Sequence, residues 1–418
     1  MRKYAPLVLL LLCCVITTHS QNTIGLPDIV NYSKQVSRAG AQNRQIRQDR
    51  KGVLYFANNE GVLTFDGIKW KIYPLPNKSI VRSIEFGPDN NLYVGGQDEF
   101  GYFAPGNSGQ LEYHSLKSLI PAADRSFTDV WDIIFYRDWV FFETSTKIFQ
   151  LNDKHCTVYK STHWRFMASY GDRLIAQDHE KGLLSFQNGV WAPFLKVNQL
   201  PQDCFATSLT GIGKDSALMT TVKNGMFILS GDKLTRFQTP VVEHIAHKNI
   251  SSAAMVNENH IAVATNLDGC YILDKKGNLV QSFSRKEGLQ NNNILSVFLD
   301  REKNLWLGLD NGIDFIAYNN AVKHIYPDYL NEGSGYAAAI HENELYIGTS
   351  NGLYKIPLYD VADLSYVKGN FHPVNNTQGQ VWNLSEVNGK LLMGHHDGSF
   401  IIENNSATGI DKTSGFWT

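Results

Sequence analysis

The chain has 418 residues, a formal net charge of −2 and 12% aromatic residues. It is longer than one ordinary domain, although β-repeat folds often run long. The charge is nearly balanced, and the sequence shows neither a basic stripe suited to nucleic acid nor an acidic run typical of a solvated tail. The composition therefore indicates a soluble, β-rich globular protein without naming a partner.

The N-terminus has the features of a secretory signal peptide, which we assign to residues 1–20. Arg2 and Lys3 precede an apolar run from Leu7 to Ile16, and the segment ends in small residues suited to cleavage. No other stretch approaches the roughly 20 apolar residues of a membrane-spanning helix. The mature chain is therefore predicted to be exported and, by itself, unanchored.

Lipid attachment at Cys13 or Cys14 is the alternative to simple cleavage. The residues before these two cysteines are bulky or cysteine rather than small, which favours cleavage. Cys156, Cys204 and Cys270 remain in the mature chain at unrelated points of the repeat described below. At most one disulfide is possible, and buried thiols are favoured.

A repeated unit occupies most of the chain. Residues 21–44 are polar, with no clear strand until Gln45, so we expect a lead-in segment that packs on the first unit. The clearest unit, residues 293–316, has an apolar strand, a polar turn, a short strand around Trp306, a turn at 310–312 and a third strand. Three short strands cannot bury both faces of a sheet alone, so such a unit must be repeated.

Copies of this unit recur about every 42 residues, which is the length of one four-stranded propeller blade. In six copies a glycine lies seven residues after the start of the middle strand, as expected where a tight turn needs a left-handed backbone angle. The sequence therefore predicts an all-β fold, a β-propeller of four-stranded blades with about nine blade repeats. The middle strands start at Leu54, Leu92, Val140, Leu174, Leu218, Ala262, Leu305, Leu345 and Leu391.

Nine repeats exceed the four to eight blades of most propellers. We therefore predict a first seven-bladed β-propeller over residues 45–330 and the first blades of a second, incomplete propeller over residues 331–418. The last residues look like the opening of another inner strand with no blade behind it. Either the chain is a truncated piece of a longer one, which we favour, or this last strand closes a single larger ring.

The unit resembles the two-component regulator propeller repeat. The resemblance extends over about residues 45–415 and is specific for the repeat but weak about ligand. The residues that carry it are 293–300, 304–308 and 311–313, repeated at 342–349 and 351–353, with 55–67 and 93–102 resembling the start of exported sensor regions of that family.

This resemblance implies an exported, periplasmic, ligand-sensing region of a hybrid two-component or helix-turn-helix regulator. In that family two propellers are followed by a β-sandwich, a membrane helix, and a histidine kinase or DNA-binding output domain. These 418 residues contain none of those later parts, so the implied signalling and DNA-binding activities cannot reside in them. Membrane contact would come only through the missing C-terminal parts, no nucleic acid is expected to bind this segment, and a homodimer is compatible with the family.

In a propeller, the loops that enter the inner strands share one face with the turns between second and third strands, and ligand sites gather there. Aromatic rings beside amide and carboxylate groups suit an oligosaccharide or another extracellular small molecule. Each residue taken singly is also explained by turn formation or blade packing, the insertion at 97–99 least so. The candidate ligand-binding residues are Asn58, Asn59, Arg82, Gln97, Asp98, Glu99, Trp131, Trp164, Arg165, Asp178, His179 and Trp382.

No cofactor, metal site or catalytic residue is predicted. The adjacent histidines of His395-His396-Asp397 tend to point apart, and no third histidine has matching spacing, so we expect a solvated turn there. Carboxylates such as Asp98 and Asp178 are available for glycosidase chemistry, but no spacing selects a pair. We therefore predict a non-catalytic sensor. The alternatives are a polysaccharide lyase or glycoside hydrolase on the same fold, and a protein–protein interaction platform.

Overall fold

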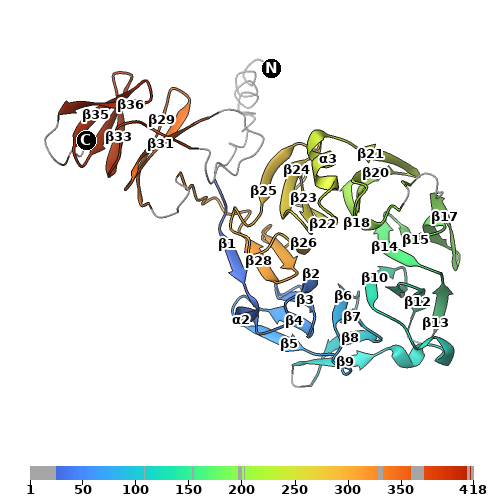
Figure 1. Ribbon diagram of the computed structural model, residues 1–418. Coiled ribbons are helices and arrows are strands. Elements are labelled where there is room, and N and C mark those ends of the chain that lie inside the picture. The colour runs from blue at the N-terminus through green and yellow to red at the C-terminus, as the bar shows by residue number, and fades with distance from the viewer. Residues whose placement is uncertain are drawn as a thin grey trace, which may run out of the picture.

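The computed structural model describes residues 25–107, 109–152, 155–195, 200–201, 203–327, 333–358, 371–411 and 415. The predicted signal peptide lies outside this part of the chain. In the described residues the strands form nine four-stranded antiparallel sheets. Seven sheets stand as blades around a common axis, and two more follow (Figure 1). The predicted all-β propeller architecture is confirmed.

The first three blades follow the chain order, each with its first strand nearest the axis. Blade one contains β2 (Asn43–Gln48), β3 (Leu54–Asn58), β4 (Gly61–Phe65) and β5 (Trp70–Tyr73). Blade two contains β6 (Val81–Phe86), β7 (Leu92–Gly96), β8 (Phe100–Pro105) and β9 (Leu111–Ser115). Blade three contains β10 (Val130–Tyr136), β11 (Trp139–Thr144), β12 (Lys147–Leu151) and β13 (Cys156–Lys160).

The next three blades repeat this order. Blade four contains β14 (Trp164–Tyr170), β15 (Arg173–Asp178), β16 (Gly182–Gln187) and β17 (Val190–Leu195). Blade five contains β18 (Ala206–Gly213), β19 (Ser216–Thr221), β20 (Met226–Ser230) and β21 (Lys233–Phe237). Blade six contains β22 (Ile250–Met255), β23 (His260–Thr265), β24 (Cys270–Asp274) and β25 (Leu279–Phe283).

Blade seven takes its outer strand from the N-terminal side of the sequence. Three strands come from the repeat unit, β26 (Ile294–Leu299), β27 (Leu305–Leu309) and β28 (Gly312–Ile316), and the fourth is β1 (Ile29–Tyr32), which pairs antiparallel with β28. The expectation of no clear strand before Gln45 is therefore wrong, because β1 precedes it and β2 begins at Asn43. A ring closed in this way leaves no bare edge on β28.

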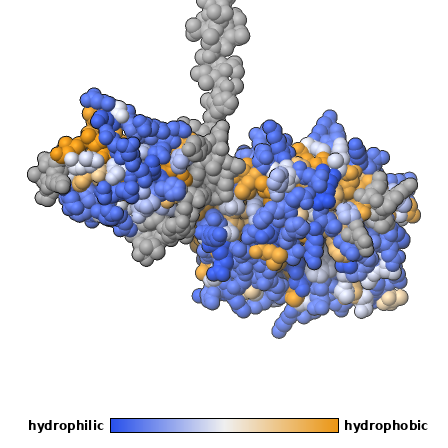
Figure 2. Space-filling view, turned by 45° about the horizontal axis from the view of Figure 1, so that its top comes forward, coloured by the Kyte–Doolittle hydropathy of each residue, from blue (hydrophilic) through white to orange (hydrophobic). Residues whose placement is uncertain are grey.

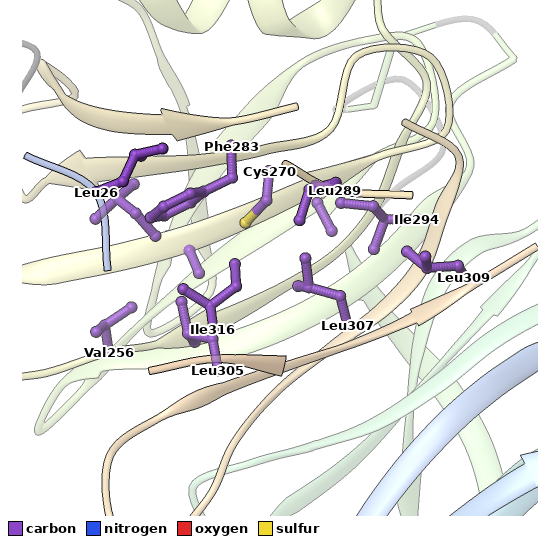
Figure 3. Close-up of a cluster of buried hydrophobic side chains, with 13 residues drawn as sticks. Leu26, Val256, Cys270, Phe283, Leu289, Ile294, Leu305, Leu307, Leu309 and Ile316 are labelled. Atoms are coloured by element: carbon purple, nitrogen blue, oxygen red, sulfur yellow. The ribbon is translucent and has the colours of Figure 1, made fainter. Parts of the chain in front are cut away.

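The hydrophobic core lies between neighbouring blades rather than in one central mass. In one cluster Leu26 packs with Cys270 and Phe283 of blade six and with Leu307 and Ile316 of blade seven (Figure 3). All five side chains are at most 4% exposed. Because sheets cover both faces of the middle strands, those strands read as nearly continuous apolar runs, which is why the repeat was visible in the sequence.

The cysteines agree with the prediction of buried thiols in two of three cases. Cys204 and Cys270 are buried, Cys156 is half-buried, and all three are free. Burial raises the pKa of the Cys270 thiol to about 12 and that of Cys204 to about 11, so both are protonated and unreactive at neutral pH.

Every innermost strand of the ring carries a register shift near its start. In β6 the shift falls between Val81 and Ser83, and in β10 between Val130 and Asp132. Such a β-bulge leaves a residue unpaired and re-aims its side chain. The residues at these shifts are Arg44 with Gln45, Arg82, Trp131, Arg165, Thr207, Ser251 and Leu295.

Side chains beside the bulges form hydrogen bonds between some neighbouring blades. Asp132 Oδ2 accepts a hydrogen bond from the backbone N–H of Met167 at 2.9 Å, across blades three and four. Ser252 Oγ accepts from the N–H of Val297 at 3.1 Å, across blades six and seven. These bonds satisfy N–H groups on the edges of the innermost strands β14 and β26, which have a neighbouring strand on one side only.

The repeat glycine in blade one occupies a crowded turn. Gly61 has φ +138°, and a Cβ there would overlap the carbonyl oxygen of Tyr73 and lie 2.7 Å from Pro74 Cα. Gly67, in the next turn, has φ +94° and no atom within 4 Å of the same position.

We expect Gly61→Ala to lower the free energy of unfolding by about 2–4 kcal/mol, and Gly67→Ala by about 1 kcal/mol, because only the first substitution adds a steric clash to the unfavourable backbone angle. Urea denaturation of the two variants measures the difference. Equal losses would show that crowding at Gly61 has no role.

The two further sheets have the same strand order as the blades of the ring. The eighth contains β29 (Gly335–His341), β30 (Glu344–Thr349), β31 (Gly352–Pro357) and β32 (His372–Pro373). The ninth contains β33 (Val381–Val387), β34 (Lys390–His395), β35 (Gly398–Glu403) and β36 (Ser406–Asp411). They share a core that includes Tyr346, Val381 and Met393, as neighbouring propeller blades do.

Helices are short and peripheral. They are α2 (Lys34–Ser37), α3 (Pro240–Ala246) and the 3₁₀ turns η1 (Lys117–Leu119) and η2 (Ala122–Asp124). None of the helices in the described ranges is long and apolar enough to cross a membrane. The surface in Figure 2 is mainly hydrophilic, with apolar residues in separate small patches.

Candidate functional site

The loops that enter the inner strands contact the turns between second and third strands, as the sequence predicts. Gln97 in the β7–β8 turn forms a β-bridge with Asp129, just before β10. The N–H of His179, in the β15–β16 turn, donates to the carbonyl oxygen of His163 at 3.0 Å, just before β14. We call the side of the ring with these loops the loop face.

Three bulge residues from the first three blades meet at the loop face, and we call Arg44, Arg82 and Trp131 the axial cluster. The guanidinium carbons of Arg44 and Arg82 lie 5.2 and 5.3 Å from the centroid of the Trp131 ring. Blades one and three are not neighbours, so the contact between Arg44 and Trp131 forms on the axial side of blade two. Each cation–π contact contributes about 0.5–2 kcal/mol, depending on desolvation.

The two arginines of the axial cluster differ in their counter-ions. Arg82 Nε donates to Asp129 Oδ1 at 3.1 Å, and these side chains are 14% and 20% exposed. Arg44 makes no hydrogen bond or ion pair within the described ranges, and its Nε is buried without a partner. Burial lowers the pKa of Arg44 and the charge of Arg82 lowers it further, whereas the carboxylates of Asp129 and Asp310 partly offset this by raising it. The nearby Asp310 instead accepts from Gln42 Nε2 at 2.5 Å.

The two carboxylates of the insertion at 97–99 in blade two bind neighbouring side chains of the same blade and the loop that follows it. Asp98 Oδ2 lies 2.9 Å from Lys117 Nζ. Glu99 Oε1 accepts from Ser115 Oγ at 2.7 Å and from the hydroxyl of Tyr113 at 3.1 Å. Gln97 therefore borders the axial cluster through Asp129, whereas both carboxylates of the insertion stabilise the turn that carries them.

A second group of predicted residues gathers on the loop face at blades four and five. Arg165 Cζ lies 4.4 Å from the centroid of the Phe205 ring, and the His179 ring stacks on the same phenylalanine at 5.9 Å. Arg165 and His179 are exposed. Burial lowers the pKa of neighbouring His163, with smaller effects from Arg165 and His179, so this histidine is neutral at pH 7.

Three predicted residues are buried and act in packing or turns. Asn58 is 0% exposed, and its Nδ2 donates to the carbonyl oxygen of Gly40 at 2.7 Å. Trp164 is 3% exposed, with its ring 5.5 Å from Trp191. Asp178 is 1% exposed and accepts from the hydroxyl of Ser161. None of the three can contact a ligand without rearrangement.

The remaining two predicted residues lie apart from both groups. Asn59 is half-buried in the β3–β4 turn, beside Gly40. Trp382 occupies the bulge position of β33 in the ninth sheet, and its Nε1 donates to Gln380 Oε1 at 3.0 Å. The structure therefore joins Arg82 with Trp131 and Arg165 with His179, rather than making one site of all twelve residues.

The expectation of a solvated turn at His395-His396-Asp397 is wrong for its first residue, because His395 is 3% exposed. Ligand atoms of the three residues lie within 4.8 Å of one another, a spacing that suits a metal. However, Nδ1 of His395 accepts from the N–H of Asp397 and Nδ1 of His396 from the N–H of Gln380, both at 3.2 Å. A neutral imidazole that accepts at Nδ1 carries its proton on Nε2, which is then closed to a metal.

A groove of about 920 Å³ lies on the opposite side of the ring, between blades one and two. Aromatic side chains line it, including Tyr55, Trp70 and Phe86, and the Trp70 ring is stacked on Phe65 at 4.2 Å. The groove contains none of the predicted site residues, because its lining comes from turns at the opposite ends of the strands. Its cationic lining residues are Arg50, Lys51, Lys69, Lys71 and Arg301.

The fold and the repeat define a β-propeller protein, and comparisons with known proteins agree. Residues 288–311 match the model of the two-component regulator propeller family, which confirms the resemblance of the repeat over that segment. A comparison with curated proteins gives no match.

Two solved structures illustrate the likeness in fold. The extracellular domain of a putative hybrid two-component system from B. thetaiotaomicron is 16% identical, with a TM-score of 0.56 over 93% of this chain and 54% of that one. Virginiamycin B lyase from Staphylococcus aureus is 12% identical, with a TM-score of 0.54 over 69% of this chain and 97% of that one. The chain thus spans about half the length of the first. At these identities the likeness shows a shared propeller fold.

Proposed function

We propose that this chain is the exported, periplasmic sensing region of a two-component-type regulator, and that it binds a glycan fragment or another small extracellular ligand at the axial cluster. The observation that carries the proposal is the half-buried Trp131 on the loop face, with the guanidinium groups of Arg44 and Arg82 close to its ring. An indole ring offers an apolar surface to a sugar, and guanidinium groups donate to its oxygens. The family match at residues 288–311 and the extracellular propeller of similar fold support the proposal.

A ligand at the axial cluster would contact the inner strands of three blades at once. Arg44 comes from β2, Arg82 from β6 and Trp131 from β10. The Arg82–Asp129 ion pair already joins blades two and three at this place. Occupancy would therefore stiffen one side of the ring, and the signal would pass onward through blade contacts to parts beyond this sequence.

We also propose that the site makes and breaks no bonds. The acids nearest the axial cluster already have structural partners: Asp129 pairs with Arg82, and Asp310 accepts from Gln42. A glycosidase needs two carboxylates placed across the substrate, one of them protonated. Acids held as counter-ions and hydrogen-bond acceptors suit binding better than proton transfer.

Thermal shift against a panel of oligosaccharides tests this proposal. A ligand that binds the native state raises the melting temperature, by the equivalent of about 2.7 kcal/mol at one hundred times its Kd. We expect at least one such shift, lost in Trp131→Ala and retained in Trp382→Ala, which changes the bulge tryptophan of the ninth sheet. A shift that survives Trp131→Ala would place binding elsewhere. Product formation from any panel member would support the lyase or hydrolase alternative, and no shift at all would favour a protein-binding platform.

A further inference from the structure

Among the described residues, Arg44 of the axial cluster has no hydrogen-bonded counter-ion. Arg44 is half-buried, its Nε is inaccessible and unpartnered, and it forms no ion pair within the described residues. Nη1 of Arg82 is also buried without a partner, although Nε of that side chain bonds to Asp129. Burying an unpaired charge costs several kcal/mol, and native structures normally neutralise it with a partner.

The nearby acids Asp129 and Asp310 favour the charged form of Arg44 from a distance, but neither forms a hydrogen bond with it. Asp129 is in contact with Arg82, and Asp310 with Gln42, so neither carboxylate is bonded to Arg44. The bulge positions of four consecutive blades hold Arg44, Arg82, Trp131 and Arg165, three cations and one aromatic ring. The bulges therefore concentrate positive charge on this part of the loop face, although the chain as a whole carries a formal charge of −2.

We infer that the axial cluster is an anion site, and that its ligand is a sugar carrying an acidic group, with the anion on Arg44 and the sugar ring against Trp131. This inference rests on the proposed function and narrows its ligand class. A guanidinium presents a planar fork of donors that matches a carboxylate in two parallel hydrogen bonds. The indole centroid of Trp131 lies 5.2 Å from the guanidinium carbon of Arg44, so one small ligand can reach both side chains. A sulfate ester is likewise an anion that accepts hydrogen bonds from a guanidinium.

Isothermal titration with matched sugars tests the inference. The probes are trigalacturonate, its fully methyl-esterified form, which keeps the sugar rings but loses the charge, and glucose 6-sulfate. We expect an acidic probe to bind wild type at least tenfold more tightly than the ester, the scale of one lost charged hydrogen-bond partner. Preference for the carboxylate or for the sulfate identifies which acidic group the site takes.

Two variants separate a ligand role of Arg44 from a structural one. Arg44→Gln should weaken the acidic probe at least tenfold and leave the ester unchanged, whereas Arg50→Gln, with the same loss of charge on the opposite face, should bind as wild type does. Without ligand, Arg44→Gln should melt within about 2 °C of wild type, because the lost cation–π contact with Trp131 is offset by relief of the desolvated charge beside Arg82.

Equal affinity for acid and ester, or full binding of the acid by Arg44→Gln, would overturn the anion site while leaving the sensor proposal standing. Binding of neutral oligosaccharides with no response to any acidic sugar would do the same. Failure of every sugar, acidic or neutral, would overturn both.

Discussion

A variant that begins at Lys34 is expected to lose the closed ring, whereas a variant that begins at Gly25 is expected to keep it. The first lacks β1 and leaves the edge of β28 unpaired, so that blade seven has three strands. An exposed edge of this kind is a template for association with other chains. We therefore expect the shorter variant to aggregate or to elute as large oligomers in size-exclusion chromatography.

The side chains of this segment also join blades at the seam of the ring. Leu26 is 4% exposed in the cluster between blades six and seven. The Tyr32 ring lies 5.2 Å from Trp70 of blade one and 5.8 Å from Trp306 of blade seven. Removing one buried apolar side chain lowers the free energy of unfolding by about 2–5 kcal/mol. The combined loss of Leu26, Ile29 and Tyr32 therefore approaches the whole stability of an ordinary domain.

A pair of point variants tests the seam without deleting the strand. Tyr32→Ala should lower the melting temperature by about 5 °C or more, because it opens a cavity among aromatic rings of two blades. Val30→Ala, on the same strand but 40% exposed, should change it by less than about 2 °C. If the variant starting at Lys34 melts like the one starting at Gly25, β1 does not close the ring.

Glu143→Gln is expected to stabilise the protein at alkaline pH and to flatten its dependence of stability on pH. Glu143, in β11, is 0% exposed, and both of its carboxyl oxygens lack a hydrogen-bond partner. Burial raises the pKa of this carboxyl well above its usual value, and the charge of Asp132 on the paired strand raises it further. At the equivalent place in blade four stands Gln177, whose Oε1 accepts from the N–H of Ala206 at 2.9 Å.

The sign follows from proton linkage. Above about pH 4.5 the unfolded chain has lost the proton of Glu143 while the folded chain still holds it, so the unfolded state binds fewer protons and stability falls as pH rises towards the folded-state pKa. Burial also raises the pKa of Asp132 and of Asp314 to about 6, which adds losses between about pH 4 and 6. The protein should therefore be more stable near pH 5 than near pH 8.

Glutamine does not titrate, so Glu143→Gln should remove the part of the alkaline loss that belongs to Glu143. We expect a gain of about 1–3 kcal/mol at pH 8, because the amide has no charge to desolvate, and little change at pH 4.5, where both side chains are neutral in the fold. Urea denaturation between pH 4.5 and 8.5 measures it, with Glu258→Gln as the exposed control. A loss of stability at pH 8, or a curve parallel to wild type, would show that the buried carboxyl is not a source of the alkaline loss.

The blades were predictable because their pattern is local. An apolar strand such as Leu305–Leu309, a turn glycine such as Gly312 and the next strand follow within about a dozen residues, and their burial on both faces gives continuous apolar runs. By contrast, β1 has four residues, and its partner β28 lies more than 280 residues further along the chain. Nothing in the sequence of Ile29–Tyr32 indicates that pairing, so the segment looked like a lead-in.

Placing the start of blade one at Gln45 also excluded Arg44, the residue on which the proposed anion site depends. Arg82, Trp131 and Arg165 were selected from the loops and starts of the inner strands, and all three occupy β-bulges. Arg44 occupies the matching place in blade one, but the predicted start of that blade at Gln45 excluded it. Aligning the four inner strands on their bulges would have found it. Burial of Asn58, Trp164 and Asp178 was not predictable, because turn acceptors and ligand-binding polar groups look alike in sequence.

The most direct test of a ligand-sensing propeller is a crystal structure of the protein with the sugar that raises its melting temperature most. We expect the intact sugar on the loop face, against Trp131 and within hydrogen-bond distance of Arg44 or Arg82. A sugar bound in the groove between blades one and two on the opposite face, or a sugar found cleaved, would contradict this account.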